Sequence, residues 1–135
     1  MSYYIATVLN APFGEAIEKA EAALKNEGFG IISRIDIKEA LKAKIGVDFR
    51  PYTILGACNP QLAYEALKLE DKVGTMLPCN VVVQAFGPNE TEIAAIDPVA
   101  SMQAIDNPEL AKAAGEVRDR LERVVRSLET LSQPA

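Results

Sequence analysis

Apolar side chains recur along this chain with two different periods, and the period predicts which segments are helices and which are strands. Alternation at residues 29–37 and the β-rich composition of residues 2–9, 52–57, 79–86 and 91–96 predict five strands. A helical period predicts long helices at residues 13–27 and from residue 108 onward, and shorter helices are expected at residues 38–44 and 60–69. A predicted helix therefore follows each strand except the one at residues 79–86, which is followed directly by the strand at residues 91–96.

The last helix has the strongest pattern. Asn107 and Pro108 form a helix-start signal, and an apolar stripe of about six turns follows at Leu110, Ala113, Ala114, Val117, Leu121, Val124, Val125 and Leu128. The arginines of this helix could suggest a basic binding strip. Acidic residues stand four positions before three of them, which is typical of a solvated charged face.

Two of the strands predict how the sheet is covered. In residues 29–37, Phe29, Ile31, Ile35 and Ile37 share one side, which predicts a half-buried strand. In residues 79–86, Val82 and Phe86 point away from the core if Cys79, Val81, Val83 and Ala85 point toward it.

We therefore expect an α+β fold. It has a mainly antiparallel sheet of about five strands, two long helices on one face, and a shorter helix between strands three and four. An apolar patch on the other face makes a homodimer a possible assembly.

The composition narrows the classes of function. The chain has 135 residues, and we expect one domain over residues 1–135. It shows neither an apolar run of membrane-spanning length nor a secretory signal, so we predict a cytoplasmic protein that does not act in a membrane. A net charge of −5 argues against a nucleic-acid partner, and the absence of histidine removes the usual general base near neutral pH.

Candidate chemistry centres on two cysteines. Cys58 ends a strand just before a predicted helix cap at Asn59, where free amides and the helix dipole can lower a thiol pKa. Cys79 begins a strand and shares its side with Val81. Burial is a strong alternative for both sulfurs, because unpaired cysteine is often a small core residue. Helix capping likewise explains Asn59 without any role in a site.

The dipeptide Cys-Asn occurs at both positions. If the two strands are antiparallel neighbours, the cysteines meet at one end of the sheet, with Tyr52, Met76 and Asn80 as candidate ligand-binding neighbours alongside Asn59. If the strands are parallel, the cysteines lie at opposite ends. Cu(I) between the thiolates near Met76 or Met102 is conceivable, but no ligand motif supports it, so we predict neither a metal nor a cofactor.

The order LGACNP, AYEAL, GTMLPCNVVV and AIDP with a following Met resembles the bacterial and archaeal family catalogued as domain of unknown function 302. The resemblance runs over nearly the whole chain. It implies a fold of the TATA-binding-protein-like class and an antiparallel sheet, and hence the arrangement that brings Cys58 and Cys79 together. The family has no assigned activity, so the resemblance implies no catalytic residues.

Two hypotheses of function remain. One is a thiol-linked site for redox chemistry or ligand binding, with Cys58 as the more nucleophilic sulfur and Cys79 as its partner. The other is a noncovalent small-ligand-binding or homodimeric assembly module in which the cysteines are structural. Whether the protein is an enzyme stays open.

Overall fold

A computed structural model describes residues 2–132, with side chains up to residue 129. Its elements, in chain order, are β1 (Tyr4–Leu9), α1 (Phe13–Asn26), β2 (Gly30–Asp36), α2 (Ile37–Ile45), β3 (Tyr52–Cys58), α3 (Pro60–Leu69), the 3-10 helix η1 (Asp71–Met76), β4 (Cys79–Gly87), β5 (Glu90–Ile96), α4 (Pro98–Ser101) and α5 (Pro108–Ser132).

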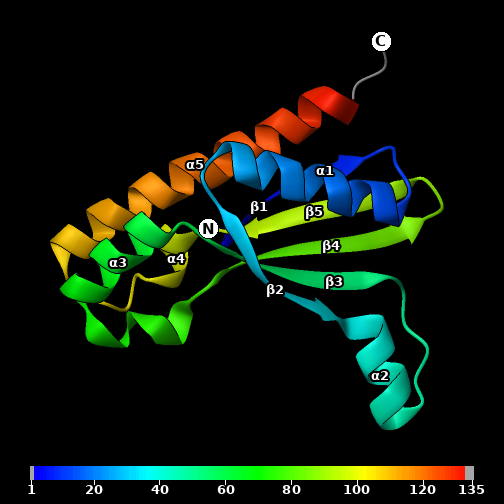
Figure 1. Cartoon of the computed structure of the whole chain (residues 1–135), viewed down its shortest axis with the longest axis horizontal. Coiled ribbons are helices and arrows are strands. Elements are labelled where there is room, and N and C mark those ends of the chain that lie inside the picture. Colours follow the sequence, from blue (N-terminus) through cyan, green and yellow to red (C-terminus); the bar gives the residue numbers. More distant parts are fainter. Residues whose placement is uncertain (1, 133–135) are drawn as a thin grey trace.

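The five strands form one sheet in the order β1-β5-β4-β3-β2, and every neighbouring pair is antiparallel. The helices α1 and α5 contact each other and lie together on one face of this sheet (Figure 1). This arrangement confirms the predicted α+β fold, including the shorter helix α3 between β3 and β4. That residues 1–135 are a single domain stays a prediction.

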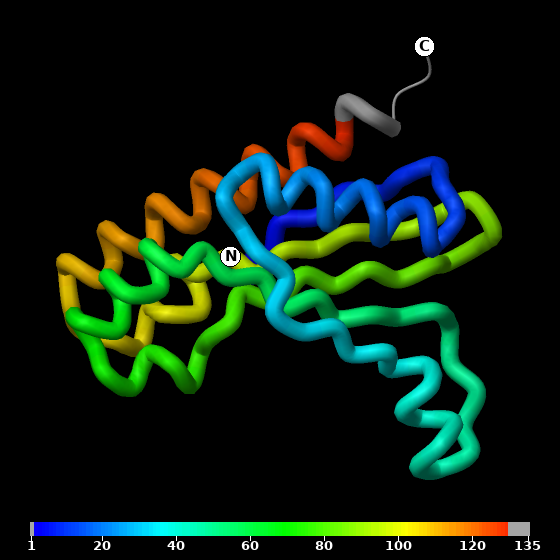
Figure 2. The backbone as a smooth tube through the Cα atoms, in the orientation of Figure 1, coloured from blue at the N-terminus to red at the C-terminus, as the bar shows by residue number. Residues whose placement is uncertain are grey.

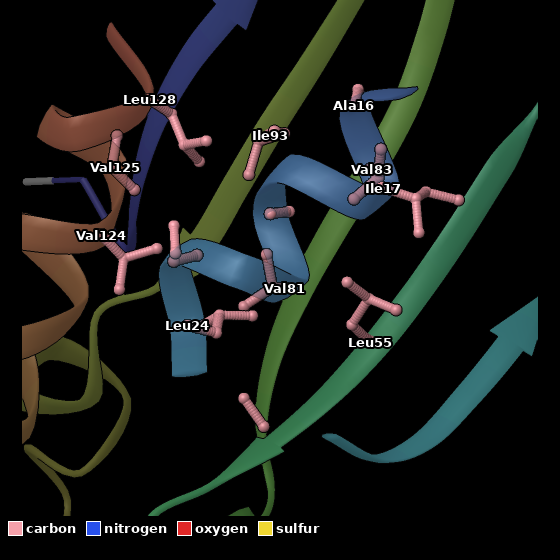
Figure 3. Close-up of a cluster of buried hydrophobic side chains, with 14 of the residues drawn as sticks. Ala16, Ile17, Leu24, Leu55, Val81, Val83, Ile93, Val124, Val125 and Leu128 are labelled. Carbon is pink, nitrogen blue, oxygen red and sulfur yellow. The ribbon is translucent and has the colours of Figure 1, made fainter. Parts of the chain in front are cut away.

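The main core fills the layer between the sheet and the two long helices. Figure 3 shows side chains of α1 and α5 meeting those of the three central strands; the labelled residues are Ala16, Ile17, Leu24, Leu55, Val81, Val83, Ile93, Val124, Val125 and Leu128. On β4, Val81 and Val83 are buried whereas Val82 is half-buried and Phe86 is exposed, which confirms the predicted alternation.

A second, smaller cluster lies beyond the ends of the strands. There α3, η1, α4 and the first turns of α5 gather at one end of the molecule, while α2 extends away at the other (Figures 1 and 2). Buried residues of the cluster are Ala66, Val73, Met102, Leu110 and Ala114. The amino-terminal part of the α5 stripe therefore packs on helices and not on the sheet.

The prediction for residues 29–37 was wrong in two respects. The pairing of β2 with β3 shifts between Ile31 and Ser33, so one extra residue reverses the alternation and leaves Ile35 48% exposed on the opposite face. The strand also ends at Asp36, whose Oδ1 accepts a hydrogen bond from the backbone of Glu39 at 2.9 Å and starts α2 at Ile37. A local bulge thus overrode the period of two.

Candidate functional site

Cys58 and Cys79 lie at the same end of the sheet. The strands β3 and β4 are antiparallel neighbours, and Ala57 is directly opposite Cys79. Cys58 is the next residue on β3 and pairs with Gly30 of β2. The antiparallel alternative is therefore the correct one, and the two sulfurs belong to one region.

The two thiols differ in environment. Cys79 is buried on the helix-covered side of the sheet, and this burial, helped by charge repulsion from Cys58, raises its pKa to about 11. Cys58 is only partly buried and is the last residue of β3. Both cysteines are free thiols.

A cavity of about 280 Å³ adjoins both cysteines. We call it the end cavity, because it lies at the end of the sheet. The end of β3, the helices α3, α4 and α5, and the segment before β4 border it, and it is partly open to solvent. Its lining residues are Phe29, Ile32, Ala57, Cys58, Asn59, Leu62, Ala63, Ala66, Leu77, Pro78, Cys79, Pro98, Met102, Leu110, Ala113, Ala114 and Val117. Apart from Asn59 and the two thiols, every lining side chain is apolar, so the cavity favours an apolar occupant.

The walls of the end cavity are held by helix caps. Asn59 Oδ1 accepts a hydrogen bond from the backbone of Leu62 at 3.1 Å, which fixes the start of α3. Asn107 caps α5 in the same way, and its Nδ2 donates to the carbonyl of Leu69 at 3.1 Å, which ties α5 to α3. Capping is therefore an observed role of Asn59.

Asp97 joins the two remaining helices of the wall. Its Oδ1 accepts from the backbone of Val99 at 3.0 Å, which begins α4, and its Oδ2 accepts from Arg118 Nε of α5 at 3.0 Å. The hydrogen bond to Asp97 raises the pKa of Arg118, so the guanidinium stays charged in this contact. The wall formed by α4 and α5 is thus fixed by a charge-assisted bond.

The turn between α1 and β2 closes tightly on the cap of α3. Gly28 has a φ of 86°, and a Cβ at this position would lie 2.9 Å from Asn59 Nδ2. A larger residue would be strained in its backbone and would displace the amide. Gly28 therefore allows the turn to pack closely against Asn59, next to Phe29 in the lining of the end cavity.

Three other candidate residues lie outside the end cavity. Tyr52 is paired with Gln84 at the far end of β3 from Cys58, so the expectation that it borders the cysteines was wrong. Asn80 follows Cys79 on β4 and pairs with Gly56, so it lies at the same end of the sheet, on the opposite face from Cys79. Tyr52 and Asn80 both line a shallow groove on the face of the sheet that α1 and α5 leave uncovered. Met76 ends η1, is 36% exposed and does not line the end cavity.

The sequence analysis missed the contribution of α4 and α5 to the site. Met102, Leu110 and Ala113 line the end cavity, although the stripe of the last helix predicted only packing. A signal was present, because 25 helical residues span about 37 Å whereas nine strand residues span about 30 Å. The excess length of α5 had to reach beyond the sheet.

Two searches of the described residues concern metal ions and membrane spans. Among the side chains of residues 2–129, no group of three or more His, Cys, Asp or Glu is placed to hold a metal ion. None of the helices within residues 2–132 combines the length and the apolar character needed to cross a bilayer.

Comparisons with known proteins agree on one family. A family model described as Domain of unknown function DUF302 matches residues 5–128. The crystal structure of an uncharacterized conserved protein DUF302 from Bacillus stearothermophilus is similar, with a TM-score of 0.86 and 31% sequence identity over 93% of this chain and 98% of that one. None of the curated proteins searched matches the chain.

Proposed function

We propose that this chain, which belongs to the DUF302 family of unknown function, binds a small apolar molecule in the end cavity, with the Cys58 thiol in contact with it. The observation that carries the proposal is an almost wholly apolar cavity with a partly exposed thiol in its wall. The proposal combines two hypotheses from the sequence: a cysteine that contacts a ligand, and a site that binds a small molecule without a covalent bond.

The size and lining of the cavity support binding. Natural ligand pockets have volumes of about 300 Å³ or more, and an engineered apolar cavity of ~150 Å³ already binds benzene. The end cavity has about 280 Å³, which suits one or two rings or a short aliphatic chain. Burying apolar area of the ligand there contributes about 25 cal/mol per Å² before the costs of association.

The difference between the thiols favours ligand contact over a dithiol redox pair. With a pKa of about 11, Cys79 is ionised in about one molecule in 10,000 at pH 7, and thiol exchange requires thiolate. Cys79 therefore serves as an apolar part of the wall. Cys58 is the sulfur that the proposal assigns to the ligand.

Binding of 1-naphthylamine, an uncharged fluorophore with two fused rings, tests this proposal. Ala113→Phe fills the end cavity, whereas the matched control Ala111→Phe adds the same ring to an exposed position of α5 that does not line it. We expect wild type and A111F to bind the fluorophore, and A113F to lose affinity by about tenfold or more. A thermal melt of each variant verifies that it is folded.

Alkylation of Cys58 gives a second readout. The bound fluorophore should slow labelling by iodoacetamide in the wild type and leave it unchanged in A113F, and Cys58→Ser should abolish labelling of the native protein. Equal binding by A113F and wild type would show that the fluorophore occupies another place and would refute the proposal. So would the absence of any binding by the wild type.

We also propose that the protein works in the cytoplasm, since two free thiols are typical of a reducing compartment. The likeness to the TATA-binding-protein-like class stays a prediction about topology. We propose no nucleic-acid partner, because the net charge of −5 opposes the counterion-release term. Mass spectrometry of the thiols in protein isolated under acid quenching tests the redox state.

A further inference from the structure

The uncovered face of the sheet is unusually apolar for a surface. Strand alternation turns Tyr4, Val8, Tyr52, Val82, Phe86 and Ile96 to this face. Three of them are about half exposed, with Tyr4 at 46%, Val8 at 49% and Phe86 at 53%. Large apolar side chains exposed together on one face of a sheet mark an interaction surface.

A polar row crosses the three central strands of this open face, near the end where β3 begins. Arg50 Nε donates to Gln84 Oε1 at 2.9 Å, and Gln84 Nε2 donates to Glu92 Oε1 at 3.0 Å. The Arg50 guanidinium also lies 5.2 Å from the centre of the Phe86 ring, which holds it against the face. The row therefore has a positive end beside β3, a neutral centre on β4 and a negative end on β5.

This charge order is complementary to itself under one two-fold rotation. An axis parallel to β4 and above Gln84 exchanges the two sides of the sheet, so that Arg50 of one copy faces Glu92 of the other. An axis across the strands would place like charges opposite each other. We propose that the open face binds a second copy of this chain about the axis parallel to β4, independently of the end cavity.

The area of the face suits such a dimer. Five strands about 4.8 Å apart and about 20 Å long give a flat footprint near 500 Å² per copy. The two copies together would bury about 1,000 Å², which is the lower bound expected for a specific interface. This flat area leaves out the extra surface of the protruding side chains. Aligned packing of two sheets at about 10 Å leaves room for Arg50 and Glu92 to meet between them.

Sedimentation equilibrium of charge-swapped variants tests the arrangement. Arg50→Glu and Glu92→Arg each place like charges opposite one another, and each should raise the dimer Kd by about tenfold or more. The double variant R50E/E92R restores opposite charges, so its Kd should return close to that of the wild type. Lys112→Glu on α5, an exposed position away from this face, is the matched control and should leave the Kd unchanged.

Two results would overturn the proposal. A wild-type chain that remains monomeric throughout the micromolar range has no such interface. Single swaps that weaken association without recovery in the double variant would reject this axis. If the face binds a peptide or a lipid and not a second copy, the double variant R50E/E92R would not recover the wild-type affinity, which also counts against the proposal. Since Arg50 and Glu92 do not line the end cavity, fluorophore binding there should be unaffected in every variant.

Discussion

The two faces of the sheet use similar apolar side chains in opposite ways. On β4, Val83 is fully buried against the helices, whereas its neighbour Val82 is half-buried on the open face. Residue type does not separate them, since both are valine. The difference lies in α1 and α5, which contact only one side, and it implies that the covered face stabilises the chain while the open face remains available for a partner.

The largest expected contrast is between two identical truncations. Val83→Ala should lower the free energy of unfolding by about 2 kcal/mol, because two methyl groups leave a closed core and a cavity remains. Val82→Ala should cost less than about 1 kcal/mol. Urea denaturation at a protein concentration below the dimer Kd measures both, and equal losses would contradict the assignment of the two faces.

A smaller effect is expected from the buried thiol at high pH. Burial raises the pKa of Cys79 from 9.0 to about 11, so the unfolded chain releases this proton first and stability falls as pH rises from about 9 to about 11. At pH 10 the free energy of unfolding should have fallen by about 1.4 kcal/mol from its value well below pH 9. Cys79→Ala should lose the extra pH dependence that wild type shows in urea denaturation.

Cys58→Ala is the matched control for the thiol. Cys58 lies at the partly exposed rim, and its removal should leave most of the decline between pH 9 and pH 11 in place. If C79A and wild type lose stability in parallel over that range, Cys79 is not shielded from water as its position indicates.

The smallest contrast concerns two threonine hydroxyls. Thr91 Oγ1 is buried and donates to the carbonyl of Ala11 at 2.9 Å, whereas Thr75 Oγ1 is exposed and donates to the carbonyl of Lys72 at 2.8 Å. Thr91→Val should cost about 1 kcal/mol, because the carbonyl of Ala11 loses its partner inside the protein. Thr75→Val should cost less than about 0.5 kcal/mol, since water replaces the hydroxyl. Thermal denaturation compares the two, and a larger loss at Thr75 would reverse the interpretation.

The sequence predictions succeeded where the interactions join residues close in the chain, and failed where they join distant segments. The caps at Asn59 and Asn107 and the alternation on β4 depend on residues a few positions apart, and the structure has them as predicted. Ile35 was misplaced because a bulge in the pairing of β2 with β3 reversed its side. The local sequence pattern does not predict a bulge of this kind, because a bulge is defined by how the strand pairs with its neighbour.

The site was only partly predictable for the same reason. The two Cys-Asn dipeptides, with the antiparallel sheet implied by the family resemblance, indicated that Cys58 and Cys79 share one end of the sheet. The distribution of residues around them was missed. Tyr52 and Asn80 lie on the open face, and Met102 of a distant segment completes the end cavity.

By itself, the sequence determined which segments are helices and strands, where the helices are capped, which family the chain belongs to and which side of β4 faces the core. Each of these depends on the identity and spacing of residues that are close together in the chain. The tertiary structure decided which helices enclose a cavity, which thiol is buried and which face stays uncovered. These properties arise when segments far apart in the chain exclude water from one another, and the positions of those segments are fixed only when the whole core packs.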